Sequence, residues 1–101
     1  MINIDQEALD LLKFMLNKHI PDATVWLFGS RSTDQIKPHS DIGLAIIASE
    51  PLAASTMAYL ETELIESDLP YKVDLVEWST LDDDFKAVIL NHYSVIQGFG
   101  A

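Results

Sequence analysis

The chain has 101 residues, of which 49% are hydrophobic and 22% charged, a composition typical of a globular protein and not of a disordered one. This length predicts a single domain over residues 1–101. Six basic against sixteen acidic residues give a formal net charge of −10, which argues against direct binding of nucleic acid, whose backbone is also negative.

Two further features limit the chemistry and the expected location. The chain has no cysteine, which excludes disulfides and thiolate metal sites. Its first residues lack the basic region and apolar core of a signal peptide, and the apolar stretch 44–48 is too short to cross a membrane. We therefore expect a cytoplasmic protein without membrane contact.

The first part of the chain predicts a helix followed by two strands. Apolar residues at helical spacing predict a helix over residues 5–19, which ends before Pro21. The β-branched and aromatic run 24–28 predicts a strand. A short helix or turn is expected over 30–35. A second strand is expected over 41–48, apolar on both faces and therefore covered from both sides.

The second part predicts a helix, a strand and a last helix. Pro51 suits a first helical position, and the apolar spacing predicts a helix over residues 49–66. Alternating polar and apolar residues predict a strand over 71–77. Three consecutive aspartates, which the helix dipole favours in a first turn, predict that the last helix begins near residue 81.

The predicted order is helix, strand, strand, helix, strand, helix. This order indicates an α/β (α+β) fold, with a small mixed sheet flanked by helices. The last helix is expected to bury Phe85, Val88 and Ile89. The tail, residues 94–101, is short and contains glycine, and it is expected to fray.

A candidate anion site follows the first predicted strand. Gly29 has no Cβ, so the backbone can turn there and a phosphate can approach main-chain N–H groups closely. Ser30 can cap the next helix, and its hydroxyl and the free N–H groups of that helix together suit an anion. Arg31 can reach a β- or γ-phosphate as a charge-assisted donor. These residues are the predicted nucleotide-binding group.

Two aspartates are candidate metal ligands. Asp41 opens a buried strand, where a carboxylate needs a partner, and a hard metal ion is the usual one. Position 43 lies two residues further along the strand, so its side chain leaves from the same face. Asp74, in the third predicted strand, is the natural third carboxylate for such a metal site. The alternatives are a capping aspartate for Asp41 and a solvated edge-strand residue for Asp74.

The spacing Gly29-Ser30, ten residues, Asp41-Ile42-Gly43 resembles the signature of the nucleotidyltransferase superfamily related to polymerase β. The resemblance implies the nucleotidyltransferase core fold, ATP as substrate, and two Mg²⁺ ions held by a triad of aspartates. Gly43 stands where the family has its second aspartate, so catalysis is predicted to be impaired. A strand glycine otherwise marks a bulge or a close backbone approach. The resemblance implies that an aspartate has been lost at this position, either naturally, in a degenerate homologue, or deliberately, to silence catalysis.

The chain length, the element order and the run Val73-Asp74-Leu75-Val76 also resemble the minimal nucleotidyltransferases. Members of that group pair with a small helical HEPN toxin, and the nucleotidyltransferase acts as antitoxin by transferring AMP from ATP to a tyrosine of the toxin. The resemblance implies the same role here, that of a protein adenylyltransferase. An acidic surface suits a basic, RNA-cleaving partner.

Two alternatives remain for the function. A non-catalytic antitoxin would neutralise its toxin by binding alone, and Gly43 favours this class. A small-molecule adenylyltransferase of the aminoglycoside type would share the motif, but normally carries an added domain. For the toxin-binding classes, an apolar docking surface is expected around Trp78, Tyr71 or the last helix.

Overall fold

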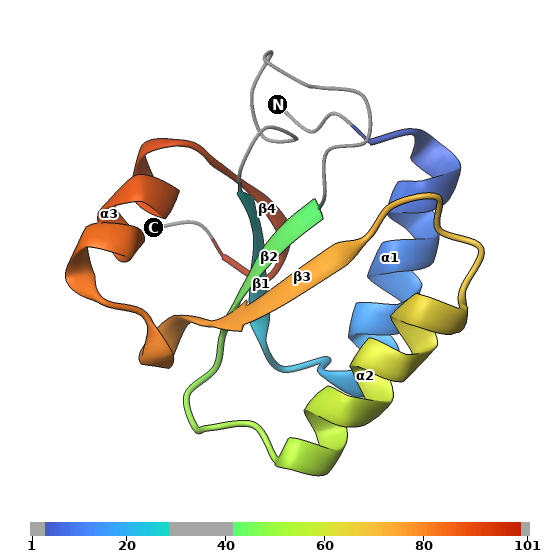
Figure 1. Cartoon of the computed structure of the whole chain (residues 1–101), viewed down its shortest axis with the longest axis horizontal. Coiled ribbons are helices and arrows are strands. Elements are labelled where there is room, and N and C mark those ends of the chain that lie inside the picture. The colour runs from blue at the N-terminus through green and yellow to red at the C-terminus, as the bar shows by residue number, and fades with distance from the viewer. Residues whose placement is uncertain (1–3, 29–41, 100–101) are drawn as a thin grey trace.

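The structure, a computed structural model, describes residues 4–28 and 42–99 (Figure 1). The elements in chain order are α1 (Gln6–His19), β1 (Thr24–Phe28), β2 (Ile42–Ile47), α2 (Ala54–Glu66), β3 (Val73–Glu77), the short 3₁₀ turn η2 (Trp78–Thr80), α3 (Asp83–Asn91) and β4 (Tyr93–Gln97).

The strands form one mixed sheet in the order β3-β2-β1-β4. β2 and β3 are parallel, and β1 is antiparallel to both β2 and β4. Helices α1 and α2 lie together on one side of the sheet and α3 lies on the other (Figure 1). The predicted fold, a small mixed sheet flanked by helices, is confirmed.

The core lies mainly between the sheet and the α1–α2 pair. The Asp5 side chain caps α1 by accepting a hydrogen bond from the Ala8 N–H at 3.2 Å, as the predicted helix start requires. The apolar stripe of α1 then packs against α2 and the sheet, and its fully buried members are Leu12, Met15 and Leu16. No helix in the described residues is long and apolar enough to cross a membrane.

Strand β2 is covered from both sides, as predicted. Ile42, Leu44 and Ile46 belong to the core beneath α1 and α2. Ala45 points to the other face, where it packs with Trp26 and Ile89 under α3. The alternation of side chains along β2 therefore assigns its residues to two separate clusters.

Two predicted helix features were wrong. Helix α2 begins at Ala54 and not at residue 49, because Ala53 has an extended backbone (φ −62°, ψ 141°). In α3 the expected stripe holds only at Ile89, which is fully buried, whereas Phe85 is 40% exposed and Val88 64% exposed. The buried strip of this short helix is narrower than its composition suggested.

The largest correction concerns the tail. Residues Tyr93–Gln97 do not fray but form β4, an edge strand paired with β1. Ser94 and Ile96 are buried there. Gly98 follows with φ 84°, a conformation that favours glycine, and the next residue stays against β1, where the Phe99 carbonyl accepts a hydrogen bond from Trp26 Nε1 at 2.6 Å. The short helix or turn expected over 30–35 lies outside the described residues.

Candidate functional site

Position 43 and Asp74 lie side by side in the sheet. They are Cα partners in the parallel pair of β2 and β3. Two residues further along each strand, Ala45 and Val76 pack into the cluster under α3. Because side chains alternate along a strand, Gly43 and Asp74 lie on that same face.

The other predicted site residues cannot be placed in this geometry. Gly29, Ser30, Arg31 and Asp41 lie outside the described residues. If Asp41 and Asp74 share a Mg²⁺ ion, the usual Mg²⁺–oxygen distances predict that their carboxylates lie within about 6 Å of each other, and this stays a prediction.

An aromatic ring fills the space above Gly43. Phe28 is the Cα partner of Gly43 on the β1 side. A Cβ placed on Gly43 would lie 2.9 Å from both Cε2 and Cζ of the Phe28 ring. Phe28 in turn meets Phe85 of α3 edge to face, with ring centroids 5.8 Å apart. Any side chain at position 43 therefore requires the Phe28 ring to move.

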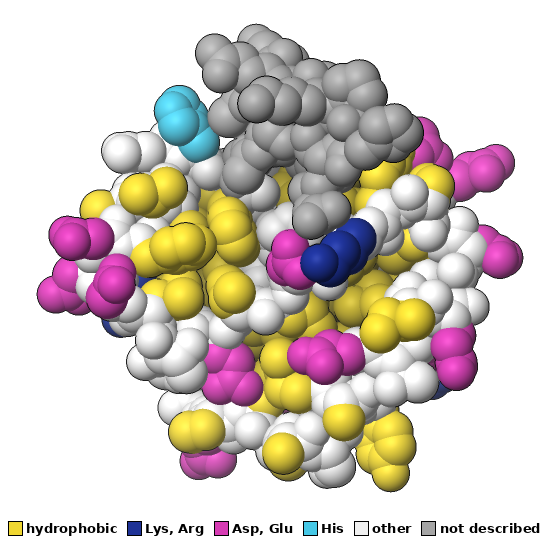
Figure 2. Space-filling model, viewed as in Figure 1, with side chains coloured by type: hydrophobic (Ala, Val, Ile, Leu, Met, Phe, Trp, Pro, Cys, Tyr) yellow, Lys and Arg dark blue, Asp and Glu magenta, His cyan; other side chains and the backbone are white. Residues whose placement is uncertain are grey.

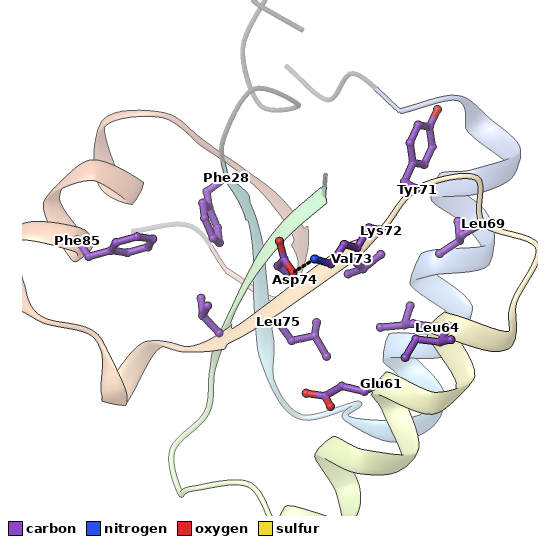
Figure 3. Close-up of a pocket in the computed structure, with 12 residues that line it drawn as sticks. Phe28, Glu61, Leu64, Leu69, Tyr71, Lys72, Val73, Asp74, Leu75 and Phe85 are labelled. Atoms are coloured by element: carbon purple, nitrogen blue, oxygen red, sulfur yellow. Dashed lines mark ion pairs between the residues drawn. The ribbon is translucent and has the colours of Figure 1, made fainter. Parts of the chain in front are cut away.

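Asp74 is open to solvent beside this aromatic pair. Its side chain is 53% exposed, and its Oδ1 lies 3.9 Å from the Nζ of Lys72, the residue directly before β3 (Figure 3). An exposed pair at this distance contributes little to stability. The Asp74 carboxylate therefore remains accessible to a ligand.

The described residues do not by themselves form a two-metal site. Among residues 4–28 and 42–99, no group of three or more His, Cys, Asp or Glu side chains is placed to hold a metal ion. Gly43 offers no side-chain ligand, so the described part of the predicted triad supplies the Asp74 carboxylate alone. A metal ion at this site needs further ligands from Asp41, the nucleotide or water.

A groove of about 800 Å³ follows β3 between α2 and α3, a volume in the range of small-molecule sites. In the space-filling view, hydrophobic side chains gather in the hollow between the two helices (Figure 2). Asp74 and Lys72 lie in its middle, with Phe28 and Phe85 on one side and Leu64 on the other (Figure 3). The candidate catalytic carboxylate therefore faces a cavity large enough for a substrate.

Sequence reasoning missed the role of Phe28 and Phe85 at this site. Local spacing predicts only that Phe28 belongs to a strand and that Phe85 belongs to the buried stripe of a helix. Their convergence on Gly43 depends on the β1–β2 register and on how α3 packs, and no short-range pattern encodes either. By contrast, the alternation within residues 71–77 places Lys72 and Asp74 on one face, and their ion pair agrees with it.

Comparison with known proteins gives a family match and a curated relative. The family model described as "Polymerase beta, Nucleotidyltransferase" matches residues 11–98, a range that includes Gly43 and Asp74. The chain is 44% identical over 96 residues to the probable protein adenylyltransferase MntA of Haemophilus influenzae, covering 95% of this chain and 84% of that protein.

Solved structures of toxin–antitoxin pairs share the fold. A mutant of the pair MntA-HpeT superposes with a TM-score of 0.74 at 23% identity, over 90% of this chain and 73% of that one. The complex of a tri-AMPylated HEPN toxin with an MNT antitoxin from Shewanella oneidensis gives 0.72 at 23% identity, over 95% and 74%. A toxin–antitoxin structure with AMP-PNP gives 0.73 at 24% identity, over 95% and 75%.

Proposed function

Because this chain belongs to the polymerase beta nucleotidyltransferase family, we propose that it is the antitoxin partner of a HEPN ribonuclease toxin and a protein adenylyltransferase by descent. The observation that carries the proposal is the 44% identity to a probable protein adenylyltransferase over 95% of this chain. The reaction would transfer AMP from ATP to a tyrosine hydroxyl of the toxin and release pyrophosphate.

The proposed nucleotide site combines backbone and side-chain groups. Gly29 and Ser30 would receive the triphosphate on main-chain N–H groups, and Arg31 would pair with a β- or γ-phosphate. Asp41 and Asp74 would hold Mg²⁺, which when bound neutralises phosphate charge and lowers the pKa of the acceptor hydroxyl. The solvent-open position of Asp74 beside the groove supports this assignment.

Gly43 is expected to make transfer slow. With no carboxylate at position 43, less negative charge is available to hold a second ion near the acceptor. Losing one preorganised stabilising group of this kind costs roughly 3–4 kcal/mol, or about 10² to 10³ in rate. The chain would then act as a weak enzyme or bind its toxin without modifying it.

The second candidate, a non-catalytic antitoxin, is favoured by the position of the Phe28 ring. The ring occupies the space that a side chain at position 43 would need, so this half of the site is filled by hydrocarbon. Neutralisation would then depend on docking. The exposed apolar side chains of α3, Val88 at 64% and Leu90 at 44%, are candidates for that surface, with Trp78 and Tyr71.

One assay distinguishes the adenylyltransferase from the non-catalytic antitoxin and from the small-molecule enzyme. The chain is mixed with labelled ATP, Mg²⁺ and the HEPN protein encoded by an adjacent gene, and label on the HEPN protein is measured beside its ribonuclease activity. Label together with lost ribonuclease activity supports the adenylyltransferase, and lost activity without label supports the binding antitoxin. A parallel reaction contains an aminoglycoside in place of the HEPN protein. Label on the aminoglycoside, together with no effect on the HEPN protein in the first reaction, would refute both and support the small-molecule enzyme.

A further inference from the structure

We infer that the groove along β3 binds an extended segment of the acceptor protein, which adds to the sheet as a further strand beside β3. The inference rests on the proposed function for the identity of the acceptor, the HEPN partner. The groove itself is a feature of the described residues. Within them β3 is an edge strand, paired only with β2.

Within residues 4–28 and 42–99, no strand pairs with the outer edge of β3, so its outward backbone groups face the groove. The Ile42 N–H donates to the Lys72 carbonyl at 2.8 Å, and Ile42 and Val73 are Cα partners in the parallel ladder. In such a ladder only every second residue bonds to the neighbouring strand. The backbone N–H and C=O groups of Asp74 therefore point to β2, while those of Val73 and Leu75 point outward. These groups repeat at the spacing of an extended chain, which is the template for strand addition.

The walls of the groove suit the side chains of an added strand. On the α2 side the lining is aliphatic, with Leu64, Ile65 and Leu69. On the α3 side it is aromatic, with Phe28 and Phe85. An added strand sends alternate side chains to the two faces of the sheet, so apolar residues on one face would meet the leucines and an aromatic residue on the other would meet the phenylalanines.

This arrangement would bring an acceptor hydroxyl near Asp74. Asp74 lies on the α3 face, between the aromatic wall and the outward groups of Val73 and Leu75. Neighbouring strands are spaced about 4.8 Å apart, so a residue paired beside Asp74 places its side chain against that carboxylate. A tyrosine at that position could lay its ring on Phe28 or Phe85, with its hydroxyl on the side of Asp74.

The charge of the chain indicates a basic segment as occupant. The formal net charge is −10, and Glu61 and Asp74 both line the groove. Lys72 is the one basic residue among the described lining residues, and it pairs with Asp74. A segment with lysine or arginine beside its tyrosine would therefore be attracted to the groove, whereas an acidic one would be repelled.

The test replaces one outward N–H. Val73→Pro removes the donor that the added strand would use, at the first residue of an edge strand, where proline is tolerated. Val73→Ala is the matched control, because it removes the same half-buried side chain and keeps the N–H. Measured by titration calorimetry with the adjacent-gene HEPN protein, Val73→Pro is expected to bind about tenfold or more weakly than Val73→Ala.

A second measurement does not depend on either variant folding. In the complex of the unmodified chain, the Leu75 amide is expected to exchange with solvent at least about tenfold more slowly than in the free chain, because it becomes hydrogen-bonded. Equal affinities of the two variants, or unchanged exchange at Leu75 in a formed complex, would refute the addition of a strand beside β3. Neither result would contradict the proposed function. Concentration-dependent protection of Leu75 without HEPN protein would instead assign the edge to a second copy of this chain, and no HEPN binding at all would refute the partner itself.

Discussion

At the scale of single residues, the contact between Phe28 and Gly43 determines what a carboxylate introduced at position 43 would displace. A Cβ at position 43 would meet the ring at 2.9 Å, but the atoms it meets are at the far end of a half-buried side chain. Rotation of Phe28 away from its contact with Phe85 would relieve the overlap. An aspartate can therefore be introduced, at a cost in packing.

Gly43→Asp is predicted to raise AMP transfer by about 10² to 10³ over the unmodified chain, since in the proposed two-metal site it would supply the charge that a second Mg²⁺ needs. It is also predicted to lower the free energy of unfolding by roughly 1–3 kcal/mol, because the Phe28 ring must be displaced. Gly43→Asn is the control, since it displaces the ring equally without the charge. Labelled-ATP assays and chemical denaturation measure the two effects, and equal transfer rates for the two variants would show that position 43 holds no metal.

At the scale of elements, local signals predicted most of the sheet and helices, and long-range pairing supplied the rest. The strand 24–28 and the end of α1 at His19 agree with the prediction because Pro21 and a β-branched, aromatic run mark them locally. β4 was missed because its stability comes from pairing with β1, far away in the sequence. The candidate site divides in the same way: Asp74 follows from alternation, whereas the Phe28 contact needs the register.

Helix α3 provides a direct test of its corrected buried face. Ile89→Ala is predicted to lower the free energy of unfolding by about 2–5 kcal/mol, because it opens a cavity beside Trp26 and Ala45. Val88→Ala, one residue away in the same helix but 64% exposed, should change it by no more than about 0.5 kcal/mol. Urea denaturation followed by tryptophan fluorescence measures both, and similar losses would mean that α3 packs differently.

The α1–α2 pair carries a pH-dependent link. Glu63 of α2 accepts from Lys18 Nζ at 2.7 Å and lies 2.5 Å from His19 Nε2, both at the end of α1. Two hydrogen bonds lower the pKa of Glu63 below its ordinary value. The one with Lys18 contributes most, and the one with His19 comes second. A lowered folded-state pKa means stabilisation that is present above the unfolded-state pKa and lost as the pH falls through the folded-state pKa.

Glu63→Gln is therefore predicted to lower Tm at neutral pH and to flatten the fall of Tm on acidification below the ordinary glutamate range, because glutamine keeps an acceptor and carries no charge to titrate. Glu66→Gln, at an exposed position in the same helix, serves as the control and should leave the difference between neutral and acid Tm close to that of the unmodified chain. Thermal melts between neutral and acid pH measure both. A Glu63→Gln profile parallel to the unmodified one would refute the link.

At the scale of the whole molecule, net charge and the open sheet edge act on different steps of partner binding. A formal charge of −10 on 101 residues produces an attractive field for a basic protein at distances where no contact has formed. The groove along β3 acts later, through hydrogen bonds and apolar walls that require contact. Charge should therefore govern how fast a partner arrives, and the edge should govern how long it stays.

The association rate with the HEPN protein is accordingly predicted to fall by about tenfold or more between low salt and 0.5 M salt, where the screening length drops to a few ångströms. The dissociation rate should change far less over the same range, because strand pairing and apolar contacts are screened weakly.

Val73→Pro should change the other rate, with faster dissociation than Val73→Ala and a similar association rate. Stopped-flow or surface-based kinetics at several salt concentrations separate the two rates. An association rate independent of salt would mean that the acidic surface faces away from the partner, and salt-dependent dissociation would mean that ion pairs, and not the edge of β3, hold the complex together.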